Sequence, residues 1–134
     1  MGYIPETTAE AVRATLLLPF VIMGLSHIVQ PGLWRDFFMR LHAFGPPAII
    51  VRTFMLELLP ASLIVALHQV WSGTAMIVTI YGHLLLVKIA VSQVIPAFGM
   101  RSLSMAEKYG KFGFRFAGLV LMGLGIICAT GLSI

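Results

Sequence analysis

This chain has little charge, few acidic residues and only one cysteine. Of its 134 residues, 10% are charged and five are acidic, whereas soluble domains carry roughly 25% charged residues. The lone Cys128 excludes an intramolecular disulfide and a CxxC redox motif, and its apolar surroundings predict a small buried side chain. The sequence also lacks an HExxH motif, a phosphate-binding loop, a dinucleotide-binding fingerprint and a recognisable nucleophile–base pair. The common soluble enzyme classes therefore find no support.

The residues that are present are mostly apolar. Hydrophobic residues make up 59% of the chain, and its mean hydropathy is +0.98. A membrane-spanning helix needs about 20 mostly apolar residues, and four segments meet that need: about 11–29, 47–69, 73–96 and 112–134. Short connections place consecutive spans antiparallel. The sequence therefore predicts an all-α integral membrane protein, with residues 1–134 forming one domain, an up-down four-helix bundle.

The basic residues indicate how the bundle lies in the membrane. The net charge is +4, and anionic lipid and membrane topology explain it better than nucleic acid does. Six bases fall on the side of the first and third connections: Arg35, Arg40, Arg101, Lys108, Lys111 and Arg115. We therefore expect a multi-pass protein of a bacterial-type inner (cytoplasmic) membrane. The positive-inside rule places the basic connections in the cytoplasm and both termini on the outer side of that membrane.

Both connections on the basic side are predicted to be structured. Aromatic and leucine side chains recur at helical spacing over residues 33–41, which predicts an interfacial helix started by Pro31 and ended by Gly45-Pro46. Ser104 and Glu107 form a capping-box pattern, which predicts that a helix begins there and runs into the fourth span. In that span Gly118, Gly125 and Ala129 share one face, and we expect this face to pack inside the bundle.

Two opposite charges lie deep in neighbouring spans. Glu57 is roughly 15 Å and Lys88 roughly 12 Å from the basic end, at 1.5 Å rise per residue. Each would cost roughly 3 kcal/mol in hydrocarbon, so we predict that they form an ion pair. His83 lies about 140° from Lys88 around its helix, so Glu57 can face one of them squarely but hardly both. Pro60 should kink the helix beside the acid.

The remaining polar side chains of the spans have separate explanations. Arg52 and Arg115 are expected to extend toward lipid phosphates, and His27 and His68 are expected at the membrane interface. His27, His68 and His83 differ in depth from one another by roughly 15 Å or more, and His42 lies in a loop, which argues against bis-histidine haem and against a metal site. Tyr81, His83 and Lys88 could each donate a hydrogen bond to a quinone carbonyl.

The end of the first span carries a family resemblance. Gly24, His27 and Pro31 are followed by Trp34 and Phe37-Phe38, and this pattern resembles the G-x-x-H … P region of DoxX-like small membrane proteins. The resemblance extends to chain length, four spans and short loops. It implies association with quinone-linked or other redox partners, often without catalytic residues of the protein's own.

These observations favour one function and leave two others open. The favoured hypothesis is an accessory membrane subunit, bound to a larger complex, that holds a quinone or lipid near five candidate residues: Glu57, His83, Lys88, Tyr81 and His27. The second is a proton-coupled transporter or channel that works as a homo-oligomer. The third is a small membrane enzyme that uses Glu57 and His83 as acid and base on a lipophilic substrate.

Overall fold

The structure, a computed structural model, describes residues 7–130, and these form helices without a strand. The elements are α1 (Thr8–Val29), α2 (Pro31–Phe44), α3 (Pro47–Arg52), the π-helix η1 (Thr53–Glu57), α4 (Leu58–Leu67), α5 (Met76–Val94) and α6 (Pro96–Thr130). Four stretches are long and apolar enough to cross a membrane: Thr8–Val29, Pro47–Leu67, Met76–Val94 and Pro96–Thr130. The predicted all-α bundle with four spans is confirmed. Residues 131–134 of the fourth predicted span lie outside the described residues.

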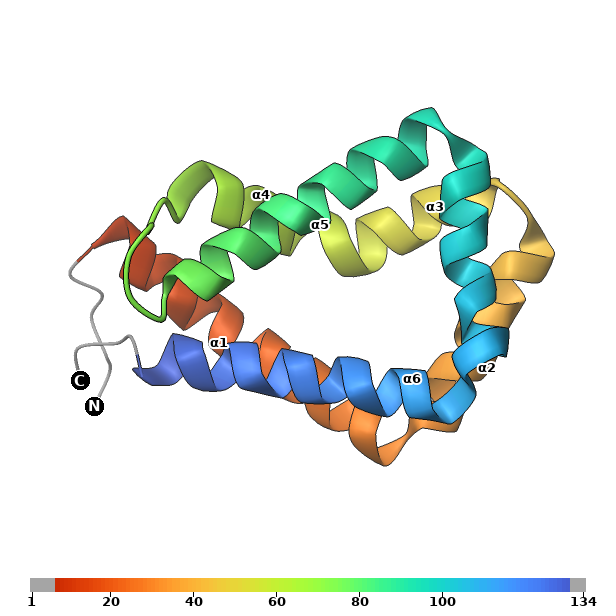
Figure 1. The fold of residues 1–134 in the computed structure, drawn as a ribbon, viewed down its shortest axis with the longest axis horizontal. Helices are drawn as coiled ribbons and strands as arrows, with labels where there is room; N and C mark the ends of the chain where they lie inside the picture. The colour runs from red at the N-terminus through yellow and green to blue at the C-terminus, as the bar shows by residue number, and fades with distance from the viewer. Residues whose placement is uncertain (1–6, 131–134) are drawn as a thin grey trace.

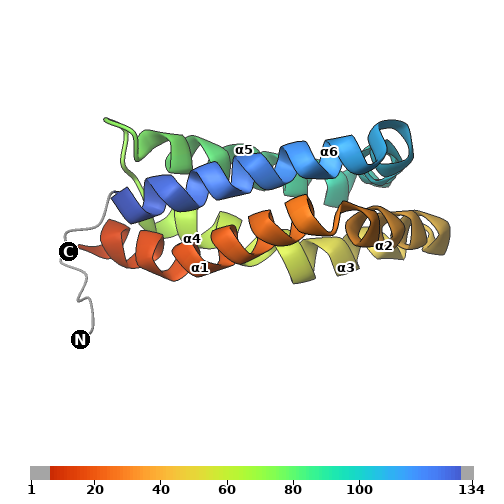
Figure 2. The same cartoon turned by 90° about the horizontal axis from the view of Figure 1, so that it is seen from below.

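The helices form two layers. One layer holds α1, α2, α3 and α4, and the other holds α5 and α6 (Figure 2). Across the layers α1 lies along the second half of α6, and α4 lies along α5, so that two helix pairs diverge from one end of the molecule (Figure 1). At the other end α2 and the first part of α6 run across the long axis and join the two pairs.

The two halves of the chain repeat the same order of elements. Each half has a long helix, a short crossing helix and a second long helix. Both crossing helices begin at a proline, Pro31 or Pro96, and in both a glycine with positive φ follows 14 positions later. These glycines are Gly45 (φ 102°) and Gly110 (φ 56°). The two halves therefore share these residues and their spacing.

The third connection differs from its prediction. Ser104 does not start a helix: it lies inside α6, which begins at Pro96, and its hydroxyl donates to the carbonyl of Arg101 at 2.7 Å. The break occurs at Gly110, whose φ of 56° is costly for residues with a Cβ. The predicted capping box is therefore wrong. The helix expected over residues 33–41 is confirmed as α2, which starts at Pro31 and ends at Phe44, just before Gly45. Its position at the membrane interface stays a prediction.

Glycines let α1 and α6 approach closely. A Cβ at position 118 would lie 2.7 Å from the carbonyl oxygen of Gly24, and a Cβ at position 125 would lie 2.7 Å from a methyl group of Val21. Small residues at such crossings bring helix backbones together, and membrane helices depend on this packing because lipid provides no hydrophobic driving force between them. The small-residue face therefore packs inside the protein, as predicted for Gly118 and Gly125.

A buried polar contact joins α1 to the turn between α4 and α5. The ring of His68 is fully buried; its Nε2 accepts from Nη1 of Arg13 at 2.9 Å and its Nδ1 donates to Oγ1 of Thr79 at 2.8 Å. Because arginine can only donate, His68 must present an unprotonated Nε2 and is therefore neutral. A partner from α1 therefore covers His68, and the interfacial position expected for it stays a prediction.

Candidate functional site

The site is built on a distortion of the second span. Pro60 has no N–H to give to the carbonyl of Leu56, so the regular α-helical pattern is interrupted there. The chain adopts π-helix over η1, and the N–H of Leu58 donates to the carbonyl of Thr53, five residues back. Side chains five apart diverge on an α-helix but share a face across a π turn. Arg52 and Glu57 are such a pair, and the distortion brings them together.

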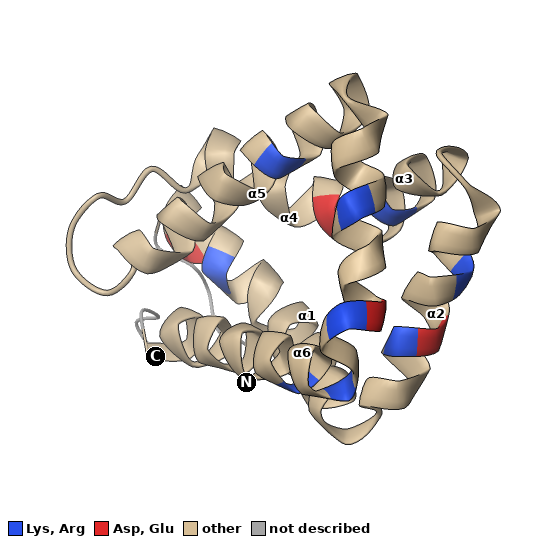
Figure 3. Ribbon diagram, turned by 45° about the vertical axis from the view of Figure 1, so that its right-hand side comes forward, with Lys and Arg blue, Asp and Glu red and all other residues tan. Residues whose placement is uncertain are grey.

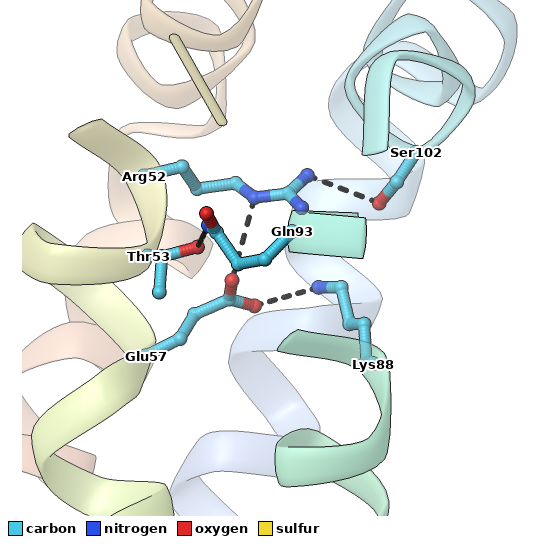
Figure 4. A network of polar contacts seen from close by, with 6 residues as sticks. All are labelled: Arg52, Thr53, Glu57, Lys88, Gln93 and Ser102. Carbon is cyan, nitrogen blue, oxygen red and sulfur yellow. Dashed lines mark hydrogen bonds and ion pairs between the residues drawn. The ribbon is translucent and has the colours of Figure 1, made fainter. Parts of the chain in front are cut away.

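Glu57 lies between two cations (Figure 4). Its Oε2 accepts from Nζ of Lys88 at 2.7 Å, and its Oε1 lies 3.3 Å from Nε of Arg52, an ion pair without hydrogen-bond alignment. The predicted Glu57–Lys88 contact is confirmed. The carboxylate is almost entirely buried, and burial of an isolated charge would be costly. The ion pairs with Lys88 and Arg52 offset the cost of burying the charge of Glu57.

Arg52 occupies a different place from the one predicted. It is 1% exposed, and its Nη1 donates to Oγ of Ser102 on α6 at 3.2 Å. Beside it the amide of Gln93 donates to the hydroxyl of Thr53 at 3.0 Å, which joins α5 to η1. The expectation that Arg52 reaches lipid phosphates is wrong, because the π turn directs it toward Glu57 and the first part of α6 covers it.

A cavity of about 860 Å³ lies against this ion cluster. Every span contributes to its wall, so it lies between the two halves of the chain. The side of Lys88 that does not touch Glu57 is open, and the side chain is 38% exposed. Most of the lining is apolar. The lining residues are Pro19, Phe20, Met23, His27, Trp34, Phe38, Arg52, Phe54, Met55, Leu56, Glu57, Leu59, Pro60, Tyr81, Leu84, Leu85, Lys88, Phe114, Phe116, Ala117, Val120 and Leu121.

An aromatic group lines the cavity near α2. The ring of His27 stacks on Trp34 with centroids 4.2 Å apart, and Phe114 lies 5.8 Å from His27. Nδ1 of His27 donates to the carbonyl of Met23 at 2.7 Å, and the indole N–H of Trp34 donates to Ser26 at 2.8 Å. These bonds fix both rings. His27 is buried within the protein, and the interfacial position expected for it stays a prediction.

The five candidate residues are not all brought together. Glu57, Lys88, Tyr81 and His27 line the one cavity, whereas His83 is absent from its wall. His83 donates from Nδ1 to the carbonyl of Thr79 at 2.8 Å and lies against the ring of Trp71. The structure therefore does not assemble Glu57 and His83 as an acid–base pair. The part of the chain that is described contains no cluster of three or more potential metal ligands.

Arg52 is the site residue that sequence reasoning missed. Its spacing of five from Glu57, with a proline three residues further on, was the available signal. In comparisons with known proteins, no protein-family model, curated protein or solved structure matches the chain. The comparisons therefore give no support to the DoxX-like assignment suggested by Gly24, His27 and Pro31.

Proposed function

We propose that this protein binds a lipophilic molecule from the bilayer in the cavity between its two halves, and that it does so as an accessory membrane subunit. The observation that carries the proposal is that a large, mostly apolar cavity lies against a buried ion cluster. Ligand sites are mostly apolar hollows with a few polar groups that fix orientation. Here the apolar wall would hold the tail of the ligand, and Lys88 would bind its polar head.

The repeated halves support a site at this place. In membrane proteins built from two repeats, substrates commonly bind where the repeats meet. This cavity takes its wall from α1 to α4 on one side and from α5 and α6 on the other. A quinone suits it in size and polarity, since Lys88 and Tyr81 could both donate to quinone carbonyls. A bilayer lipid is the other ligand class that fits.

We place the protein in an inner (cytoplasmic) membrane, with the end formed by α2 and the first part of α6 in the cytoplasm. Lysine and arginine gather on these two segments (Figure 3), and basic loops stay on the cytoplasmic side. Both crossing helices would then lie in the anionic headgroup region, and both termini would be outside.

Transport is the second candidate function. The two repeated halves could move against each other around a central site, as in transporters with parallel repeats. Proton coupling through Glu57 is less well supported, because protonating this carboxylate would break ion pairs with both Arg52 and Lys88. Glu57 is thus better suited to fixing the two cations than to carrying a proton.

The test is retention of a lipophile through purification. The protein is extracted in a mild detergent, and the bound small molecules and proteins are identified by mass spectrometry. We expect one lipophile to be retained at close to one per chain. A retained set that matches the bulk phospholipid composition would contradict the proposal. A larger membrane protein that co-purifies at fixed stoichiometry supports the accessory role; a lone chain or a homo-oligomer contradicts that role.

A matched pair of substitutions connects retention to the cavity. Ala117→Phe adds a ring to the cavity wall, whereas Ala90→Phe adds the same ring to an exposed position on α5 outside it. We expect the lipophile to be lost from the first variant and kept by the second. Equal retention by both variants would place the ligand elsewhere on the protein.

A further inference from the structure

The ion cluster does not balance its own charge. It contains two cations, Arg52 and Lys88, and one carboxylate, Glu57, and the cavity wall holds no other acidic residue. One positive charge is therefore left over in apolar surroundings. A surplus charge of this kind is costly in a region shielded from water, and it is relieved by a counter-charge.

The surplus belongs at Lys88. Arg52 is fully buried and lies against Glu57, so these two residues form an internal neutral pair. Lys88 is the more exposed of the two cations. Its ammonium group has three N–H donors, and among the residues that the structure describes it bonds only to Glu57. The remaining donors are available to a molecule in the cavity.

Arg52 also has an unused hydrogen-bond donor. Its Nη1 binds Ser102, but its Nη2 is buried and has no acceptor within the described chain. Guanidinium N–H groups bind carboxylate and phosphate oxygens particularly well. A head group with a neutral carbonyl would accept hydrogen bonds from these donors but would leave the surplus positive charge unbalanced. An anionic head group would accept the hydrogen bonds and also balance the charge.

We propose that the cavity selects lipophiles with an anionic head, a carboxylate or a phosphate, over neutral ones such as quinones, and that Lys88 is the residue that binds this head. The proposal rests on the proposed function, since it specifies the ligand of that same cavity. The tail would lie along the aromatic group that includes Trp34, and the head would lie at Lys88.

Trp34 provides a direct probe, because Trp71 is the only other tryptophan. In a Trp71→Phe background, fluorescence quenching reports on Trp34 alone. The protein in a neutral detergent is titrated at alkaline pH with dibrominated stearic acid and with its methyl ester, which share one tail and differ in charge. We expect the acid to quench Trp34 at a mole fraction about tenfold lower than the ester. Dibrominated phosphatidic acid and phosphatidylcholine, compared in the same way, separate phosphate heads from carboxylate heads.

Substitutions assign the preference to Lys88. Lys88→Gln should remove most of the difference between acid and ester, and Lys88→Arg should keep it. Arg40→Gln removes one positive charge from an exposed position on α2 outside the cavity, and should leave the preference unchanged. If Arg40→Gln lowers the preference as much as Lys88→Gln does, overall charge and not Lys88 is responsible, and the inference is overturned.

The outcomes separate this inference from the function on which it rests. Saturable quenching by acid and ester at equal mole fractions would keep the cavity as a lipophile site and overturn the selection by charge. A tryptophan ester in the same micelles gives the background level of quenching. If neither the acid nor the methyl ester quenches Trp34 beyond that level, both the lipophile site and its selection by charge are overturned.

Discussion

Arg52 and Lys88 hold the two oxygens of one carboxylate. Nε of Arg52 lies 3.3 Å from Oε1 of Glu57, and Nζ of Lys88 lies 2.7 Å from Oε2. The two cations differ in burial, because the arginine is 1% exposed and the lysine side chain 38%. This asymmetry gives them separate roles, since Arg52 balances the charge of Glu57 internally and Lys88 faces the cavity.

The first prediction concerns the stability of the ion cluster. Glu57→Gln leaves Arg52 buried without a counter-charge, and loss of one partner of a buried pair costs about 3–5 kcal/mol. Lys88→Met should cost about 1 kcal/mol or less, because Lys88 is partly exposed and Glu57 keeps Arg52. The measurement is the free energy of unfolding in mixed detergent micelles. Equal losses for the two variants would contradict the separate roles.

The second prediction concerns the crossing of α1 and α6. Gly118→Ala places a methyl group against the backbone of Gly24, and such overpacking costs about 1–3 kcal/mol. Gly123→Ala is the matched control on the same helix, since a Cβ there meets nothing within 4 Å. It should stabilise the helix by about 0.5–1 kcal/mol. Thermal unfolding of both variants in detergent measures the difference, and a stable Gly118→Ala protein would refute the close crossing.

The third prediction is a pH dependence that comes from His68. Burial, together with the nearby charge of Arg13, lowers the pKa of His68 below its ordinary value of 6.5. The folded state therefore binds the proton less well than the unfolded state does. The resulting stability is complete above about pH 6.5 and is lost as the pH falls through the lower folded-state pKa. Unfolding midpoints measured against pH should fall on acidification, and less steeply in His68→Gln. Identical slopes would show that other groups cause the fall.

The fourth prediction concerns the bend in α6. Gly110→Ala forces a residue with a Cβ into a positive φ of 56°, at a cost of roughly 1–2 kcal/mol. Lys111→Ala, at the neighbouring exposed position, should leave stability nearly unchanged. Denaturant unfolding distinguishes them. A Gly110→Ala protein as stable as the parent would mean that the bend does not need a glycine.

Much of this fold could be predicted from apolar runs and loop lengths, because bilayer thickness sets the length of a spanning helix and short connections make neighbouring spans antiparallel. The Glu57–Lys88 pair could also be predicted, since counting residues from the basic end gives depth. Arg52 could not be placed in this way. Residues are assigned to helix faces by assuming 3.6 residues per turn, and this assumption fails across a π-helix. The prediction allowed for a kink at Pro60 but not for a widened turn.

The partners of the two histidines could not be predicted either. Position along the helix indicated the interface for His68 and His27, but it did not indicate that Arg13 and Trp34 lie against them. Helix periodicity gives a direction around one helix and does not tell which helix lies beside it. The cavity itself depends on how two helix pairs diverge, and this depends on the crossing helices and on Gly110.

The most direct test of the central claim is site mapping with a photoactivatable lipophile. A fatty acid with a diazirine in its chain is cross-linked to the protein in membranes, and labelled peptides are identified by mass spectrometry. The account predicts labelling of cavity residues from both halves, such as Leu56, Leu85 and Leu121, that a saturating unlabelled fatty acid prevents. Labelling confined to outward side chains such as Leu18, Ile22 and Leu25, without competition, would show an ordinary lipid-facing surface and contradict a binding site between the halves.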